Sequence, residues 1–524
     1  MLTVITFIGF TTFVAFYAWY KLRKDSLDSS DGYFLGGRSL TGVVIAGSML
    51  LTNISTEHLI GMNGSSYKNG FIIIGWEVTS ALALVVTAVY FIPKYLRMGL
   101  TTIPEYLEKR YDGTTRSLIA LFLVVSFVVT LLPIVLYTGA INLESIFNIS
   151  EVLEVSKSQG LWITVVAIGV LGSFYAIFGG LKAVAVSDTI NGYGLIIGGL
   201  LVPIIALFSI GEGNLLTGLA KVYEHAPDKF NVVGAKDSVM PFGVLFTGLI
   251  INQLYFWGMN QTIIQRALGA KNLKEAQKGL LFTGVLKILV PLIIVLPGVI
   301  GFYYFGDSMY ENQDHIYPAL VKKVLPLGLA GFFAAVVMGA VLSTFNSVLN
   351  SAATIFSIDV YKRHIDKNAG EKRLVWIGRV TSSILAILAI LSAPLVAGAP
   401  DGLYQLLQQL NGIFFIPVAS IMLAGFFLKR ISATAAKSAL FFGLAFYLIT
   451  TFILKVDIHF IHIWGIEFVL NMIIMFAVSH FYPRISYEDK TEVLKIEMKS
   501  WRYTKHFSIA LVIITILIYV ALSL

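Results

Sequence analysis

The sequence predicts an all-α integral membrane protein with about fourteen transmembrane helices. Of its 524 residues, 57% are apolar and 13% are charged, whereas soluble domains carry about 25% charged residues. One apolar stretch after another reaches the roughly 20 residues that a helix needs to cross the hydrocarbon layer of a bilayer. A membrane β-barrel would instead show alternating segments of about ten residues, and the sequence has none of these. The chain is therefore predicted to fold as a helical bundle in lipid.

The apolar stretches define the predicted spans. They cover residues 2–20, 41–66, 72–96, 117–148, 160–178, 183–209, 240–265, 279–304, 326–360, 374–397, 400–428, 435–454, 458–482 and 506–523. The first span is expected to be a retained helix, because Lys21, Arg23 and Lys24 follow it and no basic residue precedes it. A signal peptide would carry its basic segment first.

The basic residues predict the orientation of the chain. If the N-terminus lies outside, most of the 38 Lys and Arg residues fall in alternate loops that face the cytoplasm. The positive-inside rule then supports an outside N-terminus and an outside C-terminus. We expect a multi-pass protein of the plasma (inner) membrane. This distribution also accounts for the net charge of +8 without a nucleic-acid partner.

Two predicted spans contain polar side chains near mid-membrane. The span 41–66 carries the run Asn-Ile-Ser-Thr-Glu-His at 53–58, and the span 240–265 carries Asn-Gln at 252–253 and further amides at 260–265. When the first span is counted as an extra helix, these two open consecutive sets of five helices. Interrupted helices at corresponding places in two halves indicate a midplane binding site in transporters built from inverted repeats.

The remaining polar sequence gives no sign of an enzyme. The external segments 211–239 and 306–325 are too short for a confident separate domain. The chain has no cysteine, and therefore no disulfide, thiolate metal site or thiol nucleophile, and it has no paired-histidine metal motif. We therefore expect transport and not catalysis.

Several short motifs follow one another over most of the chain. They are Tyr-Phe-Leu-Gly-Gly-Arg-Ser at 33–39, Asn-Ile-Ser at 53–55, Ile-Gly-Met at 60–62, Thr-Ile-Pro-Glu at 102–105 with Glu-Lys-Arg at 108–110, Gly-Gly-Leu at 179–181 with Asp188, Trp-Gly at 257–258 with Gln-Arg at 265–266, and Leu-Asn-Ser at 349–351 with Ile-Phe at 355–356. In these motifs the sequence resembles the sodium/solute symporter family, and specifically its sodium/sugar branch.

The resemblance covers residues 30–430 best and implies a leucine-transporter type of fold. Such a fold has a core of five plus five inverted helices with flanking helices at both ends. The implied organisation is an extra N-terminal helix and cytoplasmic loop at 1–40, a first repeat at 41–209, a second repeat with external loops at 210–428, and three flanking helices at 429–524.

Two charges inside predicted spans, Glu77 and Lys287, are candidates for substrate contact. Each would cost about 2.5–3.5 kcal/mol at the bilayer centre, so an intramembrane charge is a functional candidate by default. Facing one polar cavity, the two would offset each other's desolvation and still offer hydrogen bonds to hydroxyl groups. The alternative is a structural ion pair that only fixes helix packing. The resemblance implies sugar contact for both.

Further substrate contacts are expected around the two interrupted spans. Asn53 and His58 both donate and accept hydrogen bonds, which suits a polyhydroxy ligand. Phe256 and Trp257 are expected to stack on the apolar face of a sugar ring, or else simply to pack in the core. The implied set is completed by Ser80, Gln253 and Gln408, with Gln409 as the alternative to Gln408. Glu57 is left out, because the glucose cotransporters that the sequence resembles lack an acid there.

The resemblance also implies gates and an ion site. Met62, Trp76 and Tyr404 match a hydrophobic outer gate, although ordinary packing explains each of them equally well. For sodium, a hard cation that prefers oxygen ligands, the matching residues are the hydroxyls of Ser343 and Thr344 and the carbonyls of Leu51, Ile54 and Ala340. The two hydroxyls could instead satisfy carbonyls of their own helix. Asp188 is expected to relay the ion or to complete a second sodium site with Ser343, Asn346 and Ser347.

The predicted function is sodium-coupled symport of a monosaccharide of the glucose or galactose type by alternating access. Sodium symport of myo-inositol or another small organic solute is the first alternative. Sialic acid or proline would need a cationic or amide site for a carboxylate, which Glu77 would oppose. An uncoupled channel or sensor with the same fold is the alternative from another class.

Overall fold

The computed structural model describes residues 2–23, 28–308, 310–396, 403–484 and 496–523. Over these ranges the chain is helical with connecting turns and loops, and its only β-type pairing is an isolated bridge between Leu40 and Ala270. Twelve helical segments in the described ranges are long and apolar enough to cross a membrane. The prediction of an all-helical membrane protein is thus confirmed, while the count of fourteen spans stays a prediction.

The first half of the chain contains α1 (Leu2–Leu22), α2 (Ser30–Leu35), α3 (Gly42–Asn53), η2 (Glu57–Met62), α4 (Asn63–Asn69), η3 (Gly70–Ile74), α5 (Gly75–Val78), α6 (Ser80–Val86), α7 (Ile92–Met98), α8 (Ile103–Arg110), α9 (Gly113–Ser126), α10 (Leu132–Phe147), α11 (Ile149–Val152), α12 (Lys157–Ile210) and α13 (Leu215–His225). The second half contains α14 (Gly248–Gly258), α15 (Gln261–Leu268), α16 (Leu273–Phe305), α17 (Ile316–Val324), α18 (Leu327–Ile355), η9 (Phe356–Ile365), α19 (Glu371–Ser392), α20 (Leu403–Phe427), α21 (Ala433–Tyr447), α22 (Phe460–Phe481) and α23 (Thr504–Leu522).

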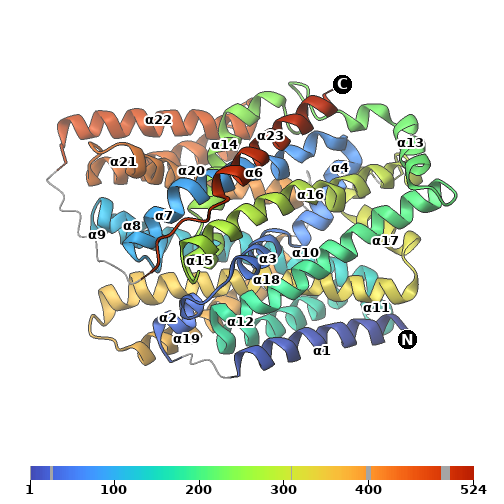
Figure 1. Cartoon of the computed structure of the whole chain (residues 1–524), viewed down its shortest axis with the longest axis horizontal. Helices are drawn as coiled ribbons and strands as arrows, with labels where there is room; N and C mark the ends of the chain where they lie inside the picture. The colour runs from blue at the N-terminus through green and yellow to red at the C-terminus, as the bar shows by residue number, and fades with distance from the viewer. Residues whose placement is uncertain (1, 24–27, 309, 397–402, 485–495, 524) are drawn as a thin grey trace.

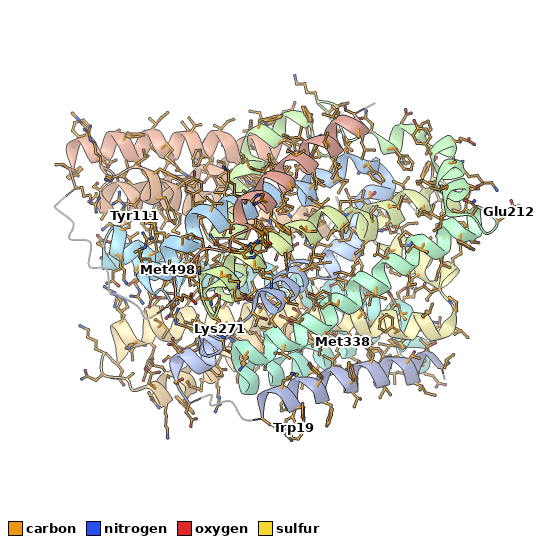
Figure 2. The ribbon with its side chains drawn as sticks, in the orientation of Figure 1. Trp19, Tyr111, Glu212, Lys271, Met338 and Met498 are labelled. Atoms are coloured by element: carbon orange, nitrogen blue, oxygen red, sulfur yellow. The ribbon has the colours of Figure 1, made fainter. Side chains whose placement is uncertain are left out.

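Most of the long helices run along one axis, which is horizontal in Figure 1. Both termini lie toward the right-hand end of the bundle, together with α13 and α17, whereas α8 and α9 lie toward the left. The outer surface is apolar, as lipid requires: Trp19 of α1 points away from the bundle in Figure 2 and is 58% exposed. Glu212, just past the end of α12, lies at the right-hand tip (Figure 2).

Both spans that the sequence predicts to be interrupted are interrupted. Helix α3 ends at Asn53, where Ile54 adopts an extended conformation (φ −86°, ψ 94°), and the chain resumes as the π-helical segment η2. Helix α14 ends at Gly258, and α15 restarts after Asn260, whose side chain accepts a hydrogen bond from Thr262 N. Each break leaves backbone groups without partners in their own helix.

The spans predicted at 160–178 and 183–209 form the single element α12, which turns at Gly180 (φ 59°, ψ −172°). A side chain there would be strained at this positive φ, and its Cβ would lie 2.7 Å from Tyr33 O. The segment divides at this turn into two candidate spans, Lys157–Phe174 and Gly179–Ile210. The two predicted spans are therefore found, joined without a loop.

Candidate functional site

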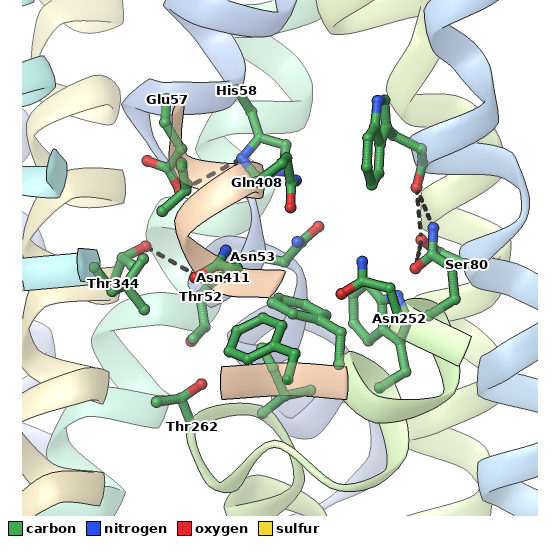
Figure 3. Close-up of a pocket in the computed structure, with 18 of the residues that line it drawn as sticks. Thr52, Asn53, Glu57, His58, Ser80, Asn252, Thr262, Thr344, Gln408 and Asn411 are labelled. Carbon is green, nitrogen blue, oxygen red and sulfur yellow. Dashed lines mark hydrogen bonds and ion pairs between the residues drawn. The ribbon is translucent and has the colours of Figure 1, made fainter. Parts of the chain in front are cut away.

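A cavity lies beside both helix breaks and is closed by α5, α6, α16, α18 and α20. It is lined by all nine residues predicted to contact substrate: Asn53, His58, Glu77, Ser80, Gln253, Phe256, Trp257, Lys287 and Gln408. Figure 3 shows His58 and Gln408 at one end of this cavity and Thr262 at the other, with Asn53 and Asn252 between them. Gln408 and not Gln409 is the lining residue, and the Gln409 carbonyl accepts a hydrogen bond from Tyr447 Oη at 3.0 Å.

The two intramembrane charges meet in this cavity. Lys287 Nζ donates a hydrogen bond to Asn53 Oδ1 at 2.6 Å and another to the Glu77 carboxylate. Both charged side chains are 1% exposed, and the ammonium lies 5.5 Å from the centre of the Trp257 ring. A buried ammonium and carboxylate need such direct pairing to offset their desolvation. The pair also holds Asn53 at the end of α3, next to the break.

Gln253 ties the second interrupted helix to α5 and α6. Its Nε2 donates to Trp76 O at 2.7 Å and to Thr79 Oγ1 at 3.0 Å. Its Oε1 accepts from Ser80 Oγ at 3.1 Å. The position of the polar lining on α14 is therefore fixed by hydrogen bonds to the helix that carries Glu77.

An aromatic cluster closes the cavity at the end that holds His58. Tyr404 packs edge-on against His58, with ring centres 5.4 Å apart, and edge-on against Trp76 at 5.8 Å. Tyr404 and Trp76 both line the cavity. Met62, the third residue predicted for the outer gate, is fully buried in an apolar core cluster and is absent from the lining. A gating role for Met62 therefore stays a prediction.

The residues predicted for sodium lie where α18 passes the end of α3. Thr344 Oγ1 donates to Thr52 O at 3.1 Å and lies 3.5 Å from Leu51 O. Ser343 and Ala340 are buried on the same helix, and Ile54 is the extended residue that ends α3. Hydroxyls and carbonyls freed from a helix ladder are the ligand type that suits sodium. The hydroxyl of Thr344 is thus held against carbonyl oxygens at the break, and Thr52 was missed by the sequence prediction.

Asp188 lines a second, smaller cavity together with Ser343 and Asn346, between α1, α12 and α18. Its Oδ2 accepts a hydrogen bond from Ser48 Oγ at 2.8 Å and lies 3.8 Å from Arg266 Nη2. Arg266 directly follows the predicted span 240–265, where a basic residue is expected in a cytoplasmic loop, but its side chain is fully buried on α15. The second break therefore brings a cation next to Asp188, which sequence spacing alone did not reveal.

Comparison with known protein families identifies the family of the chain. The model of the sodium:solute symporter family matches residues 33–443, which is well over half of the chain. The chain belongs to the sodium:solute symporter family. It is thus a multi-pass membrane transporter and not an enzyme, and sodium is its coupling ion.

Relatives of this family member differ in how much is known of them. An uncharacterized symporter of Escherichia coli strain K12, YidK, is 44% identical over 502 residues, which cover 96% of this chain and 88% of the relative. The sodium/glucose cotransporter of Vibrio parahaemolyticus is 33% identical over 435 residues, which cover 79% of this chain and 78% of the relative.

A solved structure shares the fold of this family member. A Na+-coupled sialic acid symporter in a substrate-bound outward-open state superposes with a TM-score of 0.77 at 20% identity, covering 93% of this chain and 99% of the other. At this identity the likeness establishes a shared fold and nothing about the solute.

The symporter's cavity also contains Glu57, which the sequence prediction left out of the site, and two residues that it missed. Glu57, Asn252 and Asn411 line it, and in each of these residues a buried oxygen has no hydrogen-bond partner: Glu57 Oε2, Asn252 Oδ1 and Asn411 Oδ1. Buried polar atoms in native structures are nearly always paired, so three orphaned oxygens on residues around one cavity are unusual. The sequence signal for two of them was present, because Asn252 precedes Gln253 and Asn411 follows Gln408 by one helical turn.

Proposed function

We propose that this symporter carries a monosaccharide of the glucose or galactose type into the cell together with sodium. The observation that carries the proposal is the single cavity between the two helix breaks, which gathers the nine predicted contact residues and approaches the Thr344 hydroxyl. The sodium/glucose cotransporter of Vibrio parahaemolyticus, which is 33% identical over 79% of the chain, adds support.

The cavity chemistry fits a neutral polyol. The Glu77–Lys287 pair neutralises itself while leaving carboxylate and ammonium positions for bonds to hydroxyl groups. Asn53, Gln253 and Gln408 add amide donors and acceptors, and Trp257 adds an aromatic ring beside the ammonium. A carboxylate solute would meet Glu77 as a like charge.

The proposed mechanism is alternating access. Sodium binds between the hydroxyls of Ser343 and Thr344 and the carbonyls of Leu51, Ile54 and Ala340, and holds α3 against α18 with the sugar site complete. Its release into a low-sodium cytoplasm opens the site inward. One charge crossing 100 mV supplies about 2.3 kcal/mol before any concentration gradient is counted. Asp188 relays this ion or helps to bind a second.

The proposal includes the finer architecture. Fourteen spans would cross the plasma membrane with both termini outside, and residues 41–209 and 210–428 would form inverted repeats of five helices. The extra helix at 1–40 and the three helices at 429–524 would flank this core. The two helix breaks, which open the proposed repeats, support this division.

The test is uptake by the purified protein in proteoliposomes, with glucose, galactose and myo-inositol offered with and without an inward sodium gradient. We expect concentrative uptake of a hexose only with sodium. Preference for myo-inositol would move the substrate assignment to that polyol. Sodium-independent equilibration would favour the channel, and a complete lack of sugar uptake would contradict the proposal.

A further inference from the structure

Trp464 of α22 packs against the predicted outer gate. Its side chain is fully buried, and its ring lies edge-on to Trp76, with ring centres 6.2 Å apart. Trp76 in turn lies edge-on to Tyr404 at 5.8 Å. Trp76 and Tyr404 line the cavity, whereas Trp464 is not among the described residues that line it. Trp464 therefore contacts the gate without facing the solute.

The same indole packs directly on α20, the helix that carries Tyr404. A Cβ atom at Gly412 would lie 2.1 Å from Trp464 Nε1 and 2.7 Å from Tyr447 Cζ. The two rings can come this close to the α20 backbone only because residue 412 has no side chain. Tyr447 Oη also donates a hydrogen bond to Gln409 O at 3.0 Å. Side chains from α21 and α22 therefore hold α20 about two turns after Tyr404.

A third contact of Trp464 reaches α14, the first half of the second interrupted helix. A Cβ atom at Gly248 would lie 2.5 Å from Trp464 Cβ and 2.0 Å from Ile461 O. A Cβ atom at Gly465 would lie 3.1 Å from Gly248 N. Small residues on both helices thus let their backbones approach closely. Trp464 touches α5, α14 and α20, and each of these elements contributes residues to the cavity lining.

The position of Trp464 limits how the gate can open. Helix α22 lies along the upper edge of the bundle in Figure 1, in the segment 429–524 that flanks the proposed five-helix repeats. Protein interiors are closely packed, so Trp76 cannot move into the volume that the Trp464 ring fills. A smaller side chain at this position would leave space there. Opening of the gate therefore depends on a side chain from outside the proposed repeats.

We propose that Trp464 is a positioning residue that holds the predicted outer gate closed over the cavity. It acts through Trp76 and through α20, and not by contact with the solute or the ion. The inference rests on the alternating access proposed above, and it adds a flanking helix to the parts that control entry. A tryptophan that only filled the core would stabilise the protein without changing how often the cavity opens.

The test is the rate at which a membrane-impermeant methanethiosulfonate reagent, added to intact cells in sodium chloride, labels a thiol inside the cavity. The chain contains no cysteine, so Val348→Cys introduces a single thiol. Val348 lines the cavity on α18 and is fully buried, which makes labelling depend on opening. In this background we expect Trp464→Phe to speed labelling about fivefold, which corresponds to about 1 kcal/mol. Phe460→Leu, which removes a ring packed on Trp464 at 5.0 Å, should give a smaller increase.

The matched control is Trp501→Phe, because Trp501 is a buried tryptophan that packs edge-on against Phe282 at 5.7 Å and is not among the described residues of the lining. It removes the same atoms, so it should lower the thermal unfolding temperature by a similar amount and leave the labelling rate unchanged.

Equal acceleration by Trp464→Phe and Trp501→Phe would overturn the role of Trp464, as would unchanged labelling in both Trp464→Phe and Phe460→Leu. Either result would leave the proposed function standing, because sugar uptake tests that function separately. A complete lack of labelling in every variant would show that the aromatic cluster does not control access from outside, and would overturn the inference as well.

Discussion

The ion pairs Lys287–Glu77 and Arg266–Asp188 are both buried inside the bundle, and they differ in how directly their charges meet. Lys287 donates a hydrogen bond straight to the Glu77 carboxylate. Arg266 Nη2 stays 3.8 Å from Asp188 Oδ2, and the closer contact of that oxygen is the Ser48 hydroxyl at 2.8 Å. The first pair is neutral by itself and presents hydrogen-bonding atoms to a solute. The second leaves a carboxylate whose charge is less fully balanced, which we infer to be the place for a small cation.

The largest effect is expected from replacing Lys287, because the first pair then loses its ammonium. Lys287→Met leaves the buried Glu77 carboxylate uncompensated and should lower the free energy of unfolding by about 3–5 kcal/mol and abolish sugar uptake. The measurement is thermal unfolding of the detergent-solubilised protein together with uptake in proteoliposomes. Lys271→Met, at an exposed lysine, is the control.

The double variant Glu77→Gln, Lys287→Met then separates structure from substrate contact. Both charges are gone, so stability should return toward that of the unmodified protein while uptake stays lost. Recovery of uptake in this variant would contradict the assignment of the pair to the sugar site, since neither charge is left to bind a hydroxyl group.

The second pair should respond differently. Asp188→Asn keeps the shape and the acceptor for Ser48 but removes the charge, so we expect the sodium concentration for half-maximal uptake to rise about tenfold, which corresponds to about 1.4 kcal/mol. Sugar affinity at saturating sodium should change far less. The control is Asp228→Asn, at an exposed position of the segment 211–239. An unchanged sodium dependence would remove Asp188 from the ion path.

A smaller effect is expected from a single hydroxyl. Ser343→Ala deletes one proposed sodium ligand with little loss of packing, so we expect a rise of about three- to tenfold in the sodium needed for half-maximal uptake, or about 0.7–1.4 kcal/mol. Ser420→Ala makes the same change on α20, where the hydroxyl donates to Ile416 O at 2.9 Å. If both variants shift sodium dependence equally, Ser343 does not bind the ion.

The smallest change belongs to Met62, which the structure places in the apolar core and away from the cavity lining. Met62→Leu conserves volume and should change the free energy of unfolding by less than about 1.5 kcal/mol. Sugar affinity should stay the same. A large loss of sugar affinity with normal stability would instead support a gating role for Met62.

The sequence predicted the helix breaks and the cavity well, because polar runs such as 53–58 are conspicuous in apolar spans. It also predicted that Glu77 and Lys287 face one cavity, since two isolated intramembrane charges need each other. It could not place Arg266, because an arginine beside a basic loop reads as cytoplasmic until the break after Gly258 turns α15 inward. The predictions for Met62 and Glu57 required the direction in which each side chain points. Both residues lie in the π-helical segment η2, where ordinary helical spacing does not apply.

The measurement that tests the central claim most directly is the mutual effect of sodium and sugar on binding to the purified protein. If one cavity and the adjoining sodium ligands form a coupled unit, sodium should raise sugar affinity by the same factor by which the sugar raises sodium affinity. Titration calorimetry gives both factors, and we expect them to be equal and at least about fivefold, or about 1 kcal/mol. Sugar binding that is unaffected by sodium would contradict the claim that the helix breaks couple the two solutes.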